Sequence, residues 1–171
     1  AAVNLATKAL PPVSSPPPRS NGGVKRPTTT MLPSVSTATR EAEFSPCWSP
    51  DGRMICFGSR DQGATLLFTI SASGGSPRRL ATTGASSPTE PDWSPDGKWI
   101  AFTSQTRSSF DICIVQANGG RGGESIPLVE GEDPSWAPNS RALIFCRGRD
   151  HAKQLSLLDV PTKRVKTLPR I

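Results

Sequence analysis

The sequence predicts an all-β fold made of three similar four-stranded antiparallel units, and three observations support this. A five-residue stretch, WSPDG, stands at residues 48–52 and again at 93–97, and a looser copy, WAPNS, stands at 136–140. Each copy precedes an apolar segment with the two-residue period of a strand rather than the 3.6-residue period of a helix. Proline and glycine punctuate every unit, which argues against a helical repeat of similar length.

The repeat extends well beyond the five residues. Its tryptophans, Trp48, Trp93 and Trp136, are 45 and 43 residues apart, and a proline stands two residues before and two residues after each of them. A basic residue follows five positions after each tryptophan, Ile or Leu seven positions after it, and Phe nine positions after it. Agreement at this many offsets indicates an internal repeat.

The pentapeptide has the composition of a hairpin turn. Serine suits the first position of a type I turn, proline the second and glycine the fourth, and Asp51 at the third can bind nearby backbone amides. A catalytic aspartate would need a partner base, acid or metal, and none recurs beside it. In the third copy Ser140 replaces glycine, so a left-handed backbone there would cost about 1–2 kcal/mol, and we expect a looser hairpin or another turn. The residues assigned to the structural repeat are Trp48, Pro50, Asp51, Gly52, Trp93, Pro95, Asp96, Gly97, Trp136, Pro138 and Asn139.

Each unit contains enough apolar segments for four short strands. The segments MICF, WIAF and ALIF, which follow the three turns, are apolar on both faces and are therefore expected to be buried on both sides. Four-stranded units of about 40 to 45 residues that cover each other's faces are the blades of a β-propeller. We predict a partial β-propeller with blades at 43–86, 87–130 and 131–171, with one tryptophan per blade packing between neighbours.

The most complete repeat carries a family resemblance. Residues 91–104 read PDWSPDGKWIAFTS, and FDICIV and a Gly-Gly turn follow. This pattern resembles the repeat of the TolB family of propellers. The resemblance implies a noncatalytic, periplasmic, protein-binding scaffold of the Tol-Pal system for envelope integrity and transport, with the peptidoglycan-associated lipoprotein as partner. Similar repeats form the substrate-gating propellers of prolyl-oligopeptidase-type serine peptidases, which is the alternative.

The N-terminal region is expected to differ in organisation from the three repeats. Residues 3–10 resemble residues 158–165 at the end of the third repeat, so we interpret 1–10 as the tail of a preceding blade. Residues 11–42 are rich in Pro, Ser and Thr and are expected to form a flexible segment. Propellers close with roughly four to eight blades, so the simplest interpretation of three blades is a fragment of a longer protein.

Composition argues against several functional classes. The net charge of +6 is spread along the chain, which predicts a solvated basic surface and no nucleic-acid site. No apolar run approaches the roughly 20 residues needed to span a bilayer, so no membrane insertion is expected. Four cysteines without CxxC spacing and a lone His151 favour buried free thiols over a metal site or disulfides. We expect no cofactor and no metal.

The chain carries no GxSxG motif, so no catalytic residue is assigned and no enzyme activity is expected. For a peptidase, the catalytic domain would have to lie beyond Ile171. Candidate partner-binding residues precede the inner strand of each blade and are expected at the mouth of the central channel, where their acidity could recruit a basic partner or a cation. They are Glu43, Glu90, Glu132 and Asp133. The alternative role, as solvated loop carboxylates, is equally compatible with the sequence.

Overall fold

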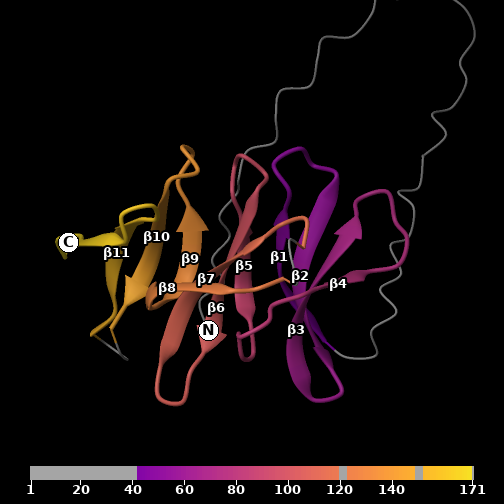
Figure 1. The fold of residues 1–171 in the computed structure, drawn as a ribbon, viewed down its shortest axis with the longest axis horizontal. Helices are drawn as coiled ribbons and strands as arrows, with labels where there is room; N and C mark the ends of the chain where they lie inside the picture. Colours follow the sequence, from indigo (N-terminus) through magenta and orange to yellow (C-terminus); the bar gives the residue numbers. More distant parts are fainter. Residues whose placement is uncertain (1–41, 120–122, 149–151, 171) are drawn as a thin grey trace, which may run out of the picture. The chain divides into compact units, whose positions relative to one another are not determined.

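The computed structural model describes residues 42–119, 123–148 and 152–170 (Figure 1). The predicted tail at 1–10, nearly all of the segment 11–42 and His151 lie outside the described residues. Every regular element among the described residues is a strand. None of these residues forms a helix long and apolar enough to span a membrane.

The strands form three four-stranded sheets, in agreement with the predicted fold class. Blade 1 consists of β1 (Glu43–Trp48), β2 (Met54–Asp61), β3 (Ala64–Ser71) and β4 (Arg78–Leu80). Blade 2 consists of β5 (Thr89–Trp93), β6 (Trp99–Gln105), β7 (Phe110–Gln116) and β8 (Ile126–Glu130). Blade 3 consists of β9 (Glu132–Trp136), β10 (Ala142–Arg147), β11 (Gln154–Asp159) and β12 (Arg164–Thr167).

Each sheet is an antiparallel meander in which the strands follow one another in chain order. The first strands of successive blades contact one another, β1 with β5 and β5 with β9 (Figure 1). We call β1, β5 and β9 the inner strands, because each lies at one edge of its own sheet and next to the first strand of the neighbouring blade.

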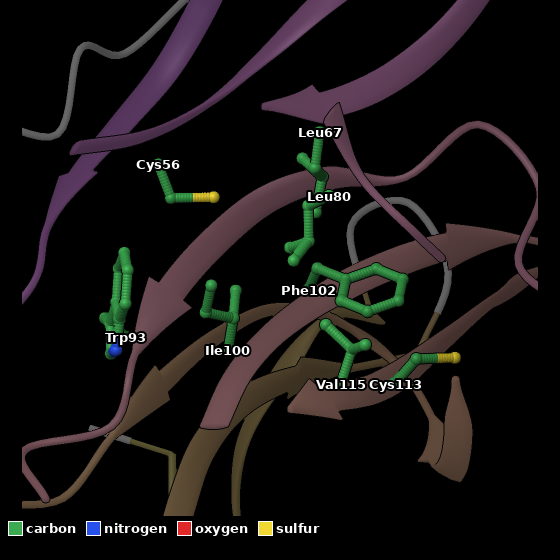
Figure 2. Close-up of a cluster of buried hydrophobic side chains, with 8 residues drawn as sticks. All are labelled: Cys56, Leu67, Leu80, Trp93, Ile100, Phe102, Cys113 and Val115. Carbon is green, nitrogen blue, oxygen red and sulfur yellow. The ribbon is translucent and has the colours of Figure 1, made fainter. Parts of the chain in front are cut away.

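Two of the three hydrophobic clusters lie between the sheets, and the third, with Phe57, Phe68 and Ile70, belongs to blade 1 alone. One cluster combines Cys56, Leu67 and Leu80 of blade 1 with Trp93, Ile100, Phe102, Cys113 and Val115 of blade 2 (Figure 2). A second cluster joins blades 2 and 3 and contains Trp136 and Phe145. Because both faces of blade 2 are covered, its central strands are apolar at consecutive positions, as the sequence pattern predicts.

The repeated tryptophans are buried in two of the three copies. Trp93 and Trp136 expose only 8% and 5% of their surface, whereas Trp48 exposes 60%. Trp93 packs against the sheet of blade 1 and Trp136 against that of blade 2. Among the described residues no sheet precedes blade 1, so Trp48 has no equivalent surface to cover it.

The WSPDG turns use their polar residues for geometry. The hydroxyl of Ser49 donates to Asp51 Oδ1 at 2.6 Å, and the same oxygen accepts the Arg53 amide at 3.0 Å. The Gly52 amide donates to the Ser49 carbonyl at 3.0 Å, which closes the turn. The second copy repeats these bonds through Ser94 and Asp96. The Asp side chains therefore hold the turns, in line with the structural interpretation.

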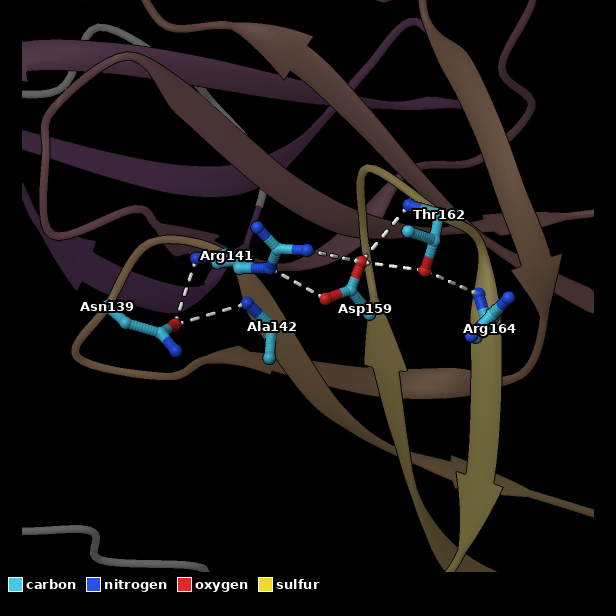
Figure 3. A network of polar contacts seen from close by, with 6 residues as sticks. All are labelled: Asn139, Arg141, Ala142, Asp159, Thr162 and Arg164. Atoms are coloured by element: carbon cyan, nitrogen blue, oxygen red, sulfur yellow. Dashed lines mark hydrogen bonds and ion pairs between the residues drawn. The ribbon is translucent and has the colours of Figure 1, made fainter.

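The third hairpin uses the same turn as the other two, so the expectation of another turn is wrong. Ser140 adopts the left-handed conformation (φ 55°), and its amide donates to the Ala137 carbonyl at 3.0 Å, as glycine does in the other copies. Asn139 Oδ1 accepts the amides of Arg141 and Ala142 at 2.9 and 3.2 Å (Figure 3). The Ser140 hydroxyl also accepts the Asp96 amide at 2.9 Å. These bonds offset the strain, and the last one joins blade 3 to blade 2.

A bulge recurs in each inner strand. The residue before the shared proline, Ser45, Glu90 or Asp133, has a positive φ of 48°, 53° or 57°. The pairing of the inner strand with its neighbour shifts at the same place in every blade. Such a left-handed residue is strained and is held only by its surroundings. Because it occurs three times, we assign it to the architecture of the blade, where a bulge redirects the chain and the side chain at that point.

Candidate functional site

The inner strands place the four predicted carboxylates at their starting ends. Glu43 is the first residue of β1, Glu90 the second of β5, and Glu132 and Asp133 are the first two of β9. Glu90 and Asp133 occupy equivalent bulge positions in neighbouring blades and are brought together. Glu43 lies opposite Ser59 of β2 within blade 1 and is exposed.

Glu90 links two blades at this end. Its Oε2 atom accepts hydrogen bonds from the Thr103 hydroxyl at 2.8 Å and from the Asp133 amide at 3.2 Å. The Asp133 amide also donates to the Thr103 hydroxyl at 3.2 Å. Burial raises the pKa of the Glu90 carboxyl, while the hydrogen bond from Thr103 opposes that rise. Through this bond, the Glu90 carboxylate helps to orient β9, the neighbouring inner strand.

Glu132 is paired with a lysine from the next hairpin. Its Oε1 atom lies 2.8 Å from Lys153 Nζ, and this bond raises the pKa of the lysine. Lys153 immediately precedes β11, so the pair joins the start of the inner strand β9 to the hairpin between β10 and β11 of the same blade. The Glu132 charge is thereby partly compensated.

A shallow pocket of about 230 Å³ opens beside this ion pair. Phe110, the first residue of β7, lines it and leaves 42% of its surface exposed. Glu130 and the Glu132–Lys153 pair supply two carboxylates and one ammonium group. The remaining lining residues are Ser108, Ser109, Gly131 and Gly148. The pocket thus combines an exposed aromatic ring with excess negative charge, a combination that suits a cationic side chain.

Two of the carboxylates at this end have partners within the protein. Glu90 accepts hydrogen bonds from a hydroxyl and an amide, and Glu132 pairs with the Lys153 ammonium group. In the described parts of the chain, no group of three or more His, Cys, Asp or Glu residues could hold a metal ion. All four cysteines carry free thiols, with Cys56 and Cys113 buried and Cys47 and Cys146 half-buried.

Sequence reasoning did not identify Thr103, Phe110, Glu130 or Lys153 as part of this site. Thr103 belongs to the apolar strand pattern and gives no separate signal. Phe110 begins the segment FDICIV, in which it looks like one more strand residue. Lys153 follows a loop whose length differs between the blades, so alignment of the repeats provides no counterpart for it. These side chains come together at the starting ends of the inner strands only when the chain is folded.

Three antiparallel four-stranded sheets with inner strands side by side and tryptophans packed between the sheets define a β-propeller unit. The family model described as TolB beta propeller domain matches residues 30–171. The chain belongs to this TolB β-propeller domain family. Among curated proteins, no match to the chain is found.

Solved structures show the same fold at low sequence identity. TolB from Acinetobacter baumannii is 24% identical with a TM-score of 0.62, over 77% of this chain and 33% of that one. A putative TolB from Agrobacterium tumefaciens is 18% identical with a TM-score of 0.63, over 78% of this chain and 64% of that one. An acylaminoacyl peptidase from Pyrococcus horikoshii is 14% identical with a TM-score of 0.55, over 77% of this chain and 25% of that one. The chain therefore spans from a quarter to less than two thirds of the length of these proteins.

Proposed function

We propose that the chain is a noncatalytic protein-binding propeller unit that binds a basic segment of a partner protein at the starting ends of its inner strands. The observation that carries the proposal is the pocket beside β9, which is lined by the exposed Phe110 and by Glu130 and Glu132. An aromatic face and a carboxylate attract a lysine or arginine side chain together. The nearby Glu90 and Asp133, and Glu43 in blade 1, would extend the acidic surface.

Membership of the TolB family supports a more specific form of this proposal. The partner would be the peptidoglycan-associated lipoprotein, and the setting would be the periplasm and the Tol-Pal system of envelope integrity and transport. Solved relatives named TolB support the fold on which this form depends.

Binding of the soluble part of that lipoprotein, measured by isothermal titration calorimetry, tests the proposal. Replacing both pocket carboxylates, Glu130→Gln with Glu132→Gln, should weaken binding roughly fivefold or more, about 1 kcal/mol. Glu124→Gln is the matched control, because Glu124 is exposed and adjoins the opposite end of β8. Equal binding by all three proteins would contradict the role of the pocket, and no binding by the wild-type chain would contradict the lipoprotein as the partner.

The alternative is the substrate-gating propeller of a serine peptidase, which the similarity to acylaminoacyl peptidases favours. The gene sequence after Ile171 separates the two. An α/β-hydrolase segment with a GxSxG motif would favour the peptidase. Further WSPDG repeats followed by a stop would favour the binding scaffold.

A further inference from the structure

Two cysteines lie directly opposite each other in the first hairpin of blade 1. Cys47 of β1 is the register partner of Cys56 of β2, and both are free thiols. Directly opposed residues in antiparallel strands have Cα atoms about 4.5–5.5 Å apart. A disulfide needs a Cα separation of about 4.4–6.8 Å, so the backbone already holds the pair within bonding range.

The pairing is particular to blade 1. The equivalent partners are Asp92 and Ala101 in blade 2 and Ser135 and Ile144 in blade 3. The repeat itself therefore does not require a cysteine at either position, although blade 1 has one at both. Blades 2 and 3 also supply natural replacements, serine at the first position and alanine at the second.

The two thiols differ in access. Cys56 is fully buried in the cluster between blades 1 and 2 (Figure 2), whereas Cys47 is half-buried and packs against that cluster. The hydrogen-bond contact with the Cys47 thiol, together with burial, holds the pKa of Cys56 well above its ordinary value. A reagent from solvent should therefore reach Cys47 first and Cys56 only through it.

We propose that Cys47 and Cys56 form a redox-sensitive pair that closes to a disulfide by exchange with a small disulfide oxidant, such as oxidised glutathione. The Cys47 thiolate attacks one sulfur of the oxidant and releases one glutathione thiolate. Cys56 then loses its proton, attacks the Cys47 sulfur of the mixed disulfide and releases the second glutathione. The protein loses two protons and two electrons, and the oxidant is reduced to two thiols.

Closure would fasten the inner strand β1 to β2 around the WSPDG turn. Cys47 is the first residue after the bulge of β1, where the register with β2 resumes. A cross-link there restricts the unfolded chain and so raises the thermal midpoint. The bond would also lie beside Trp93 and Leu67, in the core cluster that joins blades 1 and 2.

Peptide mapping of the full chain tests the pair. The folded protein is equilibrated with excess oxidised glutathione, its free thiols are blocked with iodoacetamide in denaturant, and it is digested with trypsin. Cleavage after Arg53 leaves Cys47 and Cys56 on different peptides, so a disulfide appears as two linked peptides in the mass spectrum. The thermal midpoint is measured before and after oxidation.

We expect the linked peptides to dominate in the wild-type chain and in the Cys113→Ser, Cys146→Ser double variant, with a midpoint raised by several degrees and restored by dithiothreitol. Cys47→Ser and Cys56→Ala should show neither change. The proposal is overturned if Cys47 and Cys56 are both recovered as alkylated thiols, or if Cys47 remains joined to glutathione. It is also overturned if the disulfide forms only after the protein has been unfolded. The double variant keeps the test valid even if Cys56→Ala fails to fold.

Discussion

The Asp92 carboxylate of blade 2 accepts a 2.6 Å hydrogen bond from the backbone amide of Trp136, the packing tryptophan of blade 3. The same oxygen accepts the Ser135 hydroxyl at 3.3 Å. The bond ties the end of one inner strand to the end of the next, beside the point where Trp136 enters the core. Blade 1 has Cys47 at the equivalent position, so the junction between blades 1 and 2 lacks a carboxylate there.

Asp92→Ala should weaken the junction between blades 2 and 3. A hydrogen bond to a charged group contributes about 1.5–3 kcal/mol, so we expect the free energy of unfolding in urea to fall by that amount. Asp61→Ala is the control, since Asp61 is an exposed aspartate at the end of β2 and its loss should change stability by less than about 0.5 kcal/mol. Equal effects of the two substitutions would refute the linking role of Asp92.

The tryptophan of the repeat should contribute more to stability in blade 2 than in blade 1. Trp93 is buried between two sheets, so Trp93→Ala should cost about 3–5 kcal/mol. Trp48 exposes 60% of its surface, so Trp48→Ala should cost less than about 1 kcal/mol. Urea denaturation of both variants measures the difference. Similar losses would show that Trp48 is covered in solution.

Local chemistry explains why much of the fold was predictable. The turn of Ser49 to Gly52 is specified by residues that contact one another within the turn, and strand burial follows from consecutive apolar residues such as Ile100, Ala101 and Phe102. These signals need no knowledge of distant contacts. The strand pattern and the blade architecture therefore followed from the sequence.

Features that depend on contacts between blades were not predictable. Glu90 is left-handed, although a residue before proline usually prefers extended backbone, and its carboxylate accepts the Asp133 amide of blade 3. The turn at Ser140 was mispredicted because its stabilising partner, the Asp96 amide, lies in another blade. The pocket beside Glu132 likewise requires two hairpins and the connection between β8 and β9 to meet. Nothing in one repeat unit encodes such pairings.

Substitutions at Ser140 should separate backbone strain from the bond between blades. Ser140→Ala keeps the left-handed strain and loses the hydrogen bond from the Asp96 amide, so it should destabilise by about 0.5–1.5 kcal/mol. Ser140→Gly loses the same bond but relieves about 1 kcal/mol of strain, so stability should change little. Thermal or urea unfolding distinguishes the two variants. A larger loss for glycine than for alanine would contradict this account.

A substitution at Gly52, the position equivalent to Ser140 in blade 1, tests the cost of left-handed backbone strain alone. Gly52 has a φ of 69°, and a side-chain carbon there would meet no atom within 4 Å. Gly52→Ala therefore adds conformational strain without a clash and should cost about 1–2 kcal/mol. The free energy of unfolding, measured by chemical denaturation, gives this cost. No loss of stability would indicate that this turn can relax to another conformation.

The Asp159 carboxylate should titrate far below its ordinary range. Arg141 Nε donates to it at 2.7 Å and the Thr162 hydroxyl at 2.8 Å (Figure 3), and these bonds lower its pKa from 3.8 to about 2. Because the folded pKa is depressed, its stabilising contribution is present above pH 3.8 and is lost as the pH falls toward 2. Carboxyl NMR titration should find a midpoint near 2. Arg141→Met should move it toward 3.8, whereas Lys98→Met, which removes a lysine paired with Asp96, should not. A wild-type midpoint near 3.8 would show that the Arg141 bond does not persist in solution.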